Sequence, residues 1–309
     1  MRILITGATG LLGTDLCRTL ARCHEVIGWA RRWRPVPVPE GMEVQGEPVD
    51  VARSDVVDQG IRRLKPDLVI HSAAMSDVDA CERDPDLAWA VNAQAVGIVA
   101  RACASVGAFL IAVSTDYVFG GSARRPYREE DAPSPVNLYG RVKWEGEQLA
   151  LKECERCLVV RVSGLFGSAR PNFALSTAKR FREGQKVPVV TDQVNSPSFT
   201  KDLAEAVAEL IDRFEQEPTC AESGGRLHGI LHLANSGGAS RLEVAQRLAA
   251  LLRTPTSLIE QTTWAQLSRP ARRPTNSRLD CSRLARLMGK GLRMWDEALE
   301  AFLHLEGLG

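Results

Sequence analysis

The first half of the chain alternates short apolar runs with longer amphipathic stretches. The apolar runs predict β-strands at Arg2–Thr6, Glu25–Trp29, Leu68–His71, Phe109–Ser114 and Leu158–Val162. Between them, apolar positions of helical period predict helices at Leu12–Arg22, Ser54–Leu64, Pro85–Val106 and Asn137–Lys152. This alternation predicts an α/β fold, a doubly wound parallel sheet with helices on both faces and ligands beyond the carboxyl ends of its strands.

The second half is less regular. Helical patterns recur at Asn172–Glu183, Thr200–Phe214, Arg241–Leu252 and Trp295–His304, separated by loops that contain Pro and Gly. The polar stretch Glu215–Gly229 predicts a surface loop. We expect this half to form a smaller C-terminal region that closes over the edge of the sheet and contacts the substrate.

Composition and charge narrow the class of protein. The 39 basic and 38 acidic residues nearly cancel, which disfavours nucleic acid and anionic membranes as partners. No apolar run approaches a membrane span, and the N-terminal run passes straight into glycines, so we expect a cytoplasmic protein. Cys154 and Cys157 form a C-x-x-C without a second ligand pair nearby, so we interpret them as structural thiols and predict no metal site.

A glycine loop follows the first predicted strand and opens the first predicted helix. Glycines in this position tighten the turn, and they let backbone N–H groups and the helix N-terminus approach a pyrophosphate. The context between strand and helix favours a dinucleotide site over a simple turn. The candidate cofactor-binding residues here are Gly7, Thr9, Gly10, Leu11, Leu12 and Gly13.

The end of the second strand bears on the choice of nicotinamide cofactor. An acidic residue there binds the ribose 2′-hydroxyl, whereas arginine accommodates a 2′-phosphate. Here the strand runs into Arg31 and Arg32 with no acid at its tip. NADP(H) is therefore the preferred cofactor and NAD(H) the alternative, while a solvated basic loop is the interpretation without a ligand.

Tyr139 and Lys143 lie four residues apart on a predicted helix, so they share one face. A nearby ammonium group stabilises a phenolate, which would lower the pKa of the tyrosine and suit it to general acid–base work. Thr115 emerges at the end of a predicted strand, where its hydroxyl is placed to bond the same substrate oxygen. Ser114 is a second candidate for that role, and a threonine that merely caps the strand is the structural alternative.

At these residues the chain resembles the extended short-chain dehydrogenase/reductase family, whose nucleotide site is a Rossmann fold. Within it, the sequence is most similar to the dTDP-4-dehydrorhamnose reductases. The segments that carry this closer resemblance are Ser114–Phe119, Val78–Glu82, Asn137–Gly140, Asp192-Gln193, Ser196-Pro197, Asp202–Ala204, Arg273–Ser277 and Leu279-Asp280.

The resemblance implies an NAD(P)H-dependent reductase acting on the C4 carbonyl of a deoxyhexose attached to a nucleoside diphosphate. Tyr139 would protonate the alkoxide, Lys143 would hold the nicotinamide ribose, Thr115 would orient the carbonyl and Asn92 would support the proton relay. Further implied cofactor contacts are Asp50, Val51, Ala73, Ala74 and Met75. Implied substrate contacts are Ser114, Thr115, Asp116, Tyr117, Asn195, Arg273 and Asn276, with Arg273 suited to the diphosphate.

The resemblance also implies a division of the chain. Residues 1–163 and about 200–235 would form the dinucleotide-binding domain, and about 164–199 with 236–309 the substrate-binding region. Some relatives form dimers, so a homodimer is an open expectation.

Three departures from the reductase pattern fall in the substrate region. Gly164 stands where an aromatic residue is common, Asn195 stands where glycine is usual, and Gly120-Gly121 lacks an acid that often precedes the second glycine. These changes leave the sugar open.

Two other functions stay open. Arg31-Arg32 and Pro126–Pro133 also resemble the regulatory β subunit of methionine adenosyltransferase, which shares the fold and binds a partner enzyme. A nucleotide-sugar epimerase or dehydratase would use the same fold, but dehydratases generally carry Asp-Glu where this chain has Asp116-Tyr117, which disfavours dehydration.

Overall fold

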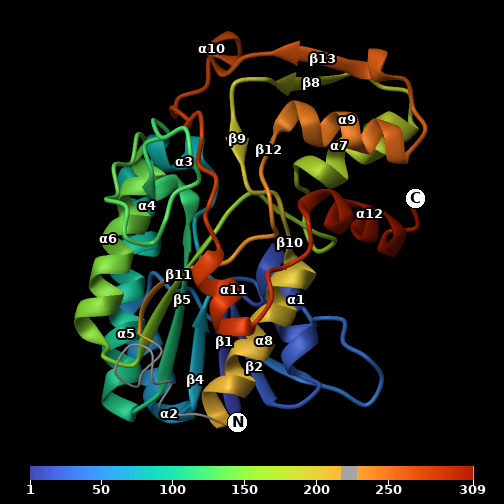
Figure 1. Ribbon diagram of the computed structural model, residues 1–309. Coiled ribbons are helices and arrows are strands. Elements are labelled where there is room, and N and C mark those ends of the chain that lie inside the picture. The colour runs from blue at the N-terminus through green and yellow to red at the C-terminus, as the bar shows by residue number, and fades with distance from the viewer. Residues whose placement is uncertain (217–227, 309) are drawn as a thin grey trace.

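The computed structural model describes residues 1–216 and 228–308, and its centre is a sheet of seven parallel strands (Figure 1). Their order across the sheet is β11-β6-β5-β4-β1-β2-β3. The bounds are β1 Arg2–Thr6, β2 Glu25–Ala30, β3 Val44–Pro48, β4 Leu68–His71, β5 Phe109–Thr115, β6 Cys157–Val162 and β11 Gly229–His232. The predicted doubly wound α/β sheet is confirmed. The two edge strands β3 and β11 were not predicted, and β3 carries only one large aliphatic residue, Val44.

Helices cover both faces of the sheet because successive strand residues point to opposite sides. Ile3 and Ile5 of β1 pack with α1 (Leu11–Leu20), α8 (Thr200–Gln216) and α11 (Ser282–Met288). Leu4 packs on the other side with α2 (Ser54–Leu64), α5 (Ala95–Val106) and α6 (Leu138–Glu153). The helix α11 therefore belongs to the core of the sheet, although its residues were expected in the substrate-binding region.

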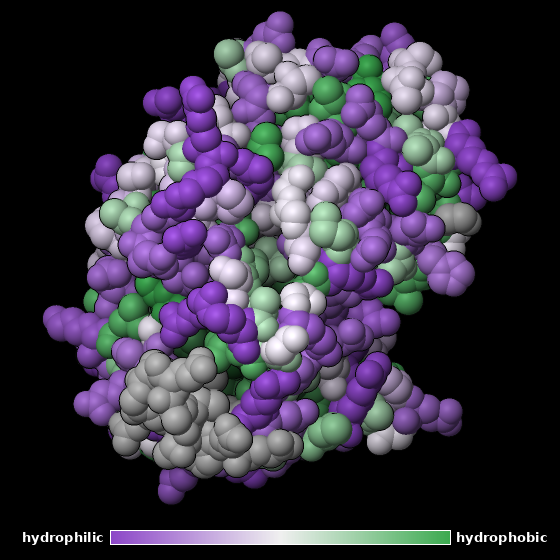
Figure 2. Space-filling view, viewed as in Figure 1, coloured by the Kyte–Doolittle hydropathy of each residue, from purple (hydrophilic) through white to green (hydrophobic). Residues whose placement is uncertain are grey.

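The predicted helix Pro85–Val106 is interrupted. It consists of α4 (Pro85–Trp89), a π-helical turn η1 (Ala90–Gln94) and α5. By length and composition this stretch could cross a membrane, but 61% of its apolar window is buried inside the protein. The apolar character of this helix is thus explained by its place in the core. In agreement, the face of the molecule seen in Figure 2 is largely hydrophilic, with hydrophobic residues in small groups.

A smaller C-terminal region lies above the carboxyl ends of the strands (Figure 1). Its own core joins three helices: α7 (Phe173–Arg182), α9 (Arg241–Leu251) and α12 (Trp295–Leu305). Three two-stranded sheets complete it, namely β7 (Leu165–Phe166) with β10 (Ser198–Phe199), β8 (Val187–Val190) with β13 (Ile259–Thr262), and β9 (Val194–Asn195) with β12 (Ala239–Ser240). Of the predicted loop Glu215–Gly229, residues 217–227 lie outside the described chain, α8 extends to Gln216 and β11 begins at Gly229.

The thiols of the C-x-x-C pair are buried and free. Cys154 and Cys157 lie beside Cys103 of α5, and burial raises the pKa of all three thiols. Within residues 1–216 and 228–308, no group of three His, Cys, Asp or Glu side chains is arranged to hold a metal ion. Buried thiols of raised pKa are unreactive, which agrees with the structural interpretation.

Candidate active site

The glycine loop leaves no room for side chains. Gly7 has φ +69°, and a Cβ there would lie 2.7 Å from the backbone nitrogen of Ala73. A Cβ at Gly13 would lie 2.1 Å from the carbonyl oxygen of Gly7. Gly10 is the N-cap of α1, so Leu11 and Leu12 form its first turn, next to Thr9. Bare backbone and a helix N-terminus at the end of β1 fit a dinucleotide pyrophosphate.

The other predicted cofactor contacts lie at the same edge of the sheet. Arg31 and Arg32 follow β2 and are exposed, and neither pairs with a carboxylate of the described residues. Asp50 and Val51 follow β3, where the Asp50 carboxylate accepts a hydrogen bond from the Ala52 backbone. Ala73, Ala74 and Met75 follow β4. Because parallel strands end at one edge, the topology gathers these segments around the glycine loop.

Tyr139 and Lys143 lie in the first turns of α6, whose N-cap Asn137 accepts from the backbone of Gly140. The ammonium of Lys143 is buried and donates to the carbonyl of Val113 at 2.7 Å, and burial lowers its pKa to about 8. Burial raises the pKa of Tyr139 above its usual value, against a hydrogen bond with Thr115 that lowers it. The expected lowering of the Tyr139 pKa is therefore not what the structure shows, because desolvation dominates while the ammonium is bonded to Val113.

A neutral histidine lies beside this ammonium. His71 is fully buried at the end of β4, and its Nδ1 is 2.9 Å from the Thr6 hydroxyl. Burial and the charge of Lys143 lower the pKa of His71 to about 3. Sequence reasoning did not single out His71, since a lone histidine at a strand end carries no motif.

Thr115 and Asp116 form the polar centre of the site. The Thr115 hydroxyl donates to Asp116 Oδ1 at 3.1 Å, and Asp116 Oδ2 accepts from Ser163 at 2.9 Å and from Ser277 at 2.5 Å. Burial raises the pKa of Asp116 to about 6, and these three hydroxyls oppose the rise. Ser163 and Ser277, which were not predicted as site residues, thus join Thr115 around one carboxylate.

Ser114 faces the opposite side of the sheet. Its hydroxyl donates at 2.5 Å to Glu147 of α6, and Glu147 forms a bidentate ion pair with Arg161 of β6. Ser114 and Arg161 are register partners on neighbouring strands, which is why both reach the same carboxylate. Both charged side chains are 1% exposed. The Ser114 hydroxyl is thereby engaged in the core, and its predicted contact with substrate stays a prediction.

A second polar group surrounds Tyr117, whose ring meets Tyr139 edge-on at 5.9 Å. Its hydroxyl accepts from Gln193 at 2.8 Å, and the Gln193 carbonyl oxygen accepts from Arg241 at 3.3 Å. The Arg241 guanidinium lies over the ring of Phe173, 4.7 Å from its centre. No carboxylate among the described residues pairs with Arg241, so its charge is available to an anion. Sequence reasoning missed Arg241 because a single arginine at a helix start is unremarkable.

Asn92 holds the loop that precedes α3 (Val78–Arg83). Its buried amide accepts from the Met75 backbone nitrogen at 2.9 Å and donates to the Met75 carbonyl at 3.0 Å. Asn92 lies in the π-helical turn η1, a feature frequent at functional sites. In this structure the side chain positions Met75, and its part in a proton relay stays a prediction.

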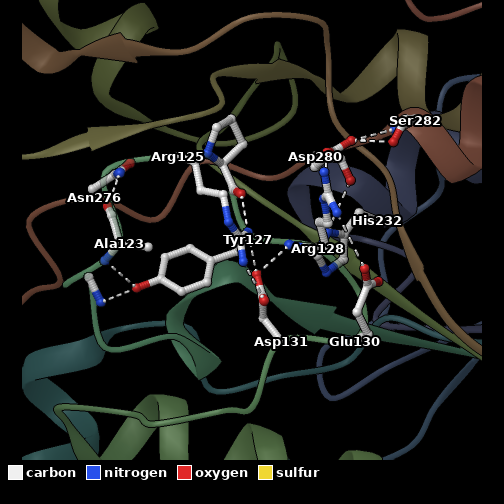
Figure 3. A network of polar contacts seen from close by, with 12 residues as sticks. Ala123, Arg125, Tyr127, Arg128, Glu130, Asp131, His232, Asn276, Asp280 and Ser282 are labelled. Atoms are coloured by element: carbon white, nitrogen blue, oxygen red, sulfur yellow. Dashed lines mark hydrogen bonds and ion pairs between the residues drawn. The ribbon is translucent and has the colours of Figure 1, made fainter.

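Arg273 and Asn276 are engaged with the protein. Arg273 forms a bidentate ion pair with Asp79 of α3 at 2.7 and 2.9 Å, and both side chains are under a tenth exposed. Figure 3 shows Asn276 directed at the carbonyl of Ala123, to which it donates at 2.5 Å. A diphosphate could reach the Arg273 fork only by displacing Asp79. Their predicted substrate contacts therefore stay predictions.

Two of the three sequence departures lie in contact. The position that a Cβ on Gly164 would take is 3.0 Å from Asn195 Oδ1 and 3.1 Å from Asn195 Nδ2. The amide of Asn195 thus fills the space next to position 164. The two departures from the reductase pattern, a missing side chain at position 164 and an amide at position 195, are therefore neighbours in the structure.

The fold and site just described match known proteins over the whole chain. The family model described as RmlD substrate binding domain matches residues 1–306. The chain is 33% identical to the spore coat polysaccharide biosynthesis protein SpsK of Bacillus subtilis, covering 98% of this chain and 97% of that one. It is 34% identical to a dTDP-4-dehydrorhamnose reductase of Streptomyces griseus, covering 99% of this chain and 94% of that one.

Solved structures of dTDP-4-dehydrorhamnose reductases also resemble the chain. The crystal structure of a dTDP-4-dehydrorhamnose reductase from Clostridium acetobutylicum has a TM-score of 0.85 and 30% identity, covering 99% of this chain and all of that one. The Bacillus anthracis dTDP-4-dehydrorhamnose reductase in complex with NADP has a TM-score of 0.82 and 29% identity, covering 98% and 99%. The chain therefore belongs to the dTDP-4-dehydrorhamnose reductase family of extended short-chain dehydrogenase/reductases.

Proposed function

We propose that this chain is an NAD(P)H-dependent oxidoreductase that reduces the C4 carbonyl of a deoxyhexose linked to a nucleoside diphosphate. The observation that carries the proposal is the grouping of Thr115, Tyr139 and Lys143 at the carboxyl end of β5, where Thr115 lowers the pKa of Tyr139 against the effect of burial and Lys143 donates to the carbonyl of Val113. Relatives named as dTDP-4-dehydrorhamnose reductases support the substrate class. The cytoplasm is the expected place of action, and a homodimer stays an open expectation.

The dinucleotide, when bound, supplies the hydride that adds to the carbonyl carbon. Gly7, Gly10 and Gly13 would hold its pyrophosphate through backbone N–H groups. Tyr139 donates its proton to the carbonyl oxygen and is left as a phenolate, while Thr115 is held in the site by its hydrogen bond to Asp116. The Lys143 ammonium stabilises the same negative charge, and because its pKa is about 8 this help is lost as the pH rises through that value.

Turnover tests the proposal directly. The protein is incubated with NADPH and dTDP-4-dehydrorhamnose, and loss of the absorbance of the reduced nicotinamide is followed. We expect substrate-dependent oxidation of NADPH and formation of the 4-hydroxy sugar nucleotide. Tight cofactor binding without turnover on this or related keto sugars would contradict the proposal and favour a cofactor-bound regulatory subunit.

Replacement of Arg31 and Arg32 tests the preference for NADP(H). The double variant Arg31→Ala/Arg32→Ala should raise the Kd for NADPH by about 10- to 100-fold, which corresponds to the loss of one charge-assisted hydrogen bond of about 1.5–3 kcal/mol to the 2′-phosphate. The Kd for NADH should change by less than about twofold, because NADH has no 2′-phosphate. Titration of the fluorescence of each cofactor measures both values. Equal weakening of the two cofactors would refute the phosphate contact.

We infer that Arg241, rather than Arg273, supplies the cation for the substrate diphosphate. Arg241 has no carboxylate partner among the described residues and reaches Tyr117 through Gln193, whereas Asp79 already neutralises Arg273. Arg241→Ala should raise the KM of the sugar nucleotide about tenfold or more with a smaller change in kcat. The control is Arg247→Ala on the same helix, which breaks only a surface ion pair with Glu300. A larger KM effect in Arg273→Ala than in Arg241→Ala would reverse the assignment.

A further inference from the structure

Residues 271–279 form a strap across the front of the active site. In Figure 1 this orange-red segment runs from α10 (Trp264–Leu267) past α3 towards α11. It contacts the dinucleotide-binding half at successive points along its length. At its start, Ala271 and Arg273 donate to Asp79, and the carbonyl of Arg272 accepts from Asn137. Further along, Thr275 and Asn276 donate to the carbonyls of Gly121 and Ala123, Ser277 donates to Asp116, and Leu279 forms a β-bridge with Tyr127. We call this segment the strap. The strap thus connects α3, which contains Asp79, to the polar centre formed by Thr115 and Asp116.

One end of the strap is fixed at Asp79. The Asp79 carboxylate accepts hydrogen bonds from both terminal nitrogens of Arg273. It also accepts one from the backbone N–H of Ala271, at 3.1 Å. Asp79 lies on α3, whose Glu82 accepts from the backbone of Leu138 at 2.9 Å, one residue before Tyr139. The Arg273 guanidinium also lies over the ring of Trp264, 4.6 Å from its centre. A buried bidentate pair with these neighbours leaves the strap little freedom at this end.

The other end reaches the polar centre. Ser277 is fully buried, its hydroxyl donates at 2.5 Å to Asp116 Oδ2, and its backbone N–H donates to Val194 O at 2.9 Å. Asp116 Oδ1 accepts the hydrogen bond of Thr115. With Oδ2 held by Ser277 and Ser163, rotation of the carboxylate is restricted, and Oδ1 fixes the direction of the Thr115 hydroxyl.

We propose that Asp79 and Ser277 are positioning residues of the reductase: Asp79 holds the strap through Arg273, and the strap holds Ser277 against Asp116, whose other oxygen accepts from Thr115 and so fixes the Thr115 side chain in the catalytic centre. The proposal rests on the proposed function. According to this proposal, the catalytic centre is correctly arranged only when the strap of the C-terminal region is bound to Asp79 and Asp116. Neither residue touches the reacting atoms.

Two single variants and their combination test this coupling. Ser277→Ala and Asp79→Asn should each lower kcat about tenfold, the loss of one charge-assisted hydrogen bond, with the KM for NADPH changed less than about twofold. If one strap carries both effects, the double variant should have a kcat within about twofold of Asp79→Asn alone. Effects that multiply in the double variant would overturn the proposal. Arg273→Lys, which keeps the charge but loses the fork, replaces Asp79→Asn if that variant fails to fold.

The ionisation of Asp116 gives a readout that does not depend on turnover. Its titratable or charged neighbours are Tyr117, Tyr139 and Arg241, with Ser163, Ser277 and Thr115 as donors. Loss of the Ser277 donor disfavours the carboxylate, so the pKa of Asp116 should rise by about one unit in Ser277→Ala. The same rise is expected in Asp79→Asn. Infrared titration of the carboxyl group, assigned with Asp116→Asn, measures it, and an unchanged Asp116 pKa in Asp79→Asn would overturn the proposal.

A matched control separates positioning from loss of stability. Asp202→Asn breaks another bidentate pair of similar carboxylate burial, with Arg293 at 2.5 and 2.8 Å, which does not contact the strap. It should lower the melting temperature and leave kcat and the Asp116 pKa unchanged. An equal loss of kcat in Asp202→Asn would show that Asp79 acts only through stability and would overturn the proposal. Wild-type protein without turnover would refute the proposed function, and the infrared titration would still decide whether the strap couples Asp79 to Asp116.

Discussion

Tyr139→Phe should lower kcat for reduction of the keto sugar by about 10²–10⁴-fold, the range for loss of a general acid. The substitution removes the phenol hydroxyl that we propose as the proton donor. Because burial raises the pKa of Tyr139, the phenol stays protonated across the neutral range and is ready to donate. Steady-state kinetics with saturating NADPH measures the loss.

The affinity for cofactor serves as the control for this variant. Phenylalanine keeps the ring and its edge-on contact with Tyr117, so the Kd for NADPH should stay within about twofold of the wild-type value. A Tyr139→Phe protein that retains wild-type kcat would show that another group protonates the alkoxide. A variant that loses cofactor affinity in step with kcat would place Tyr139 in binding.

Glu147→Ala should lower the free energy of unfolding by about 3–5 kcal/mol, the cost of removing one partner of a buried ion pair. Arg161 stays charged because a guanidinium does not lose its proton in proteins, and its side chain is only 1% exposed. The Ser114 hydroxyl loses its acceptor as well. Urea unfolding followed by circular dichroism measures the change.

The same helix supplies the comparison. Glu153→Ala removes a partly exposed partner of Arg101, 3.3 Å away at the C-terminal end of α6, and should cost less than about 1 kcal/mol. Replacing Glu147 and Arg161 together by apolar residues should recover much of the loss, since no unpaired charge then remains. A loss below about 1 kcal/mol for Glu147→Ala would mean that water reaches Arg161 in the folded state.

Sequence was sufficient for the parts of the molecule whose signal is local. The five predicted strands follow from short apolar runs, and each lies in the sheet. The glycine loop could be placed because its meaning depends only on the strand before it and the helix after it. The interruption of the predicted helix Pro85–Val106 could not be predicted, because no proline or glycine marks the π-helical turn Ala90–Gln94, which packs on α6.

The surroundings of the catalytic residues depended on long-range contacts. Asp79 and Arg273 are 194 residues apart in the chain, and Ser277 meets Asp116 across 161 residues. No periodicity connects such pairs, so an arginine suited to a diphosphate could not be distinguished from one neutralised by Asp79. Likewise Arg241 gains its interest only from Gln193 and Phe173, which other elements bring to it.

The return of α11 to the sheet has a consequence for synthesis on the ribosome. Leu284 and Met288 are buried in the same core as α1 and α8, yet they are translated after all seven strands of the sheet. Until they emerge, the apolar face that they cover stays open to water and to other chains. The nascent protein therefore cannot complete its first domain before most of the second has been made, and its need for protection from aggregation lasts at least until α11 has been translated.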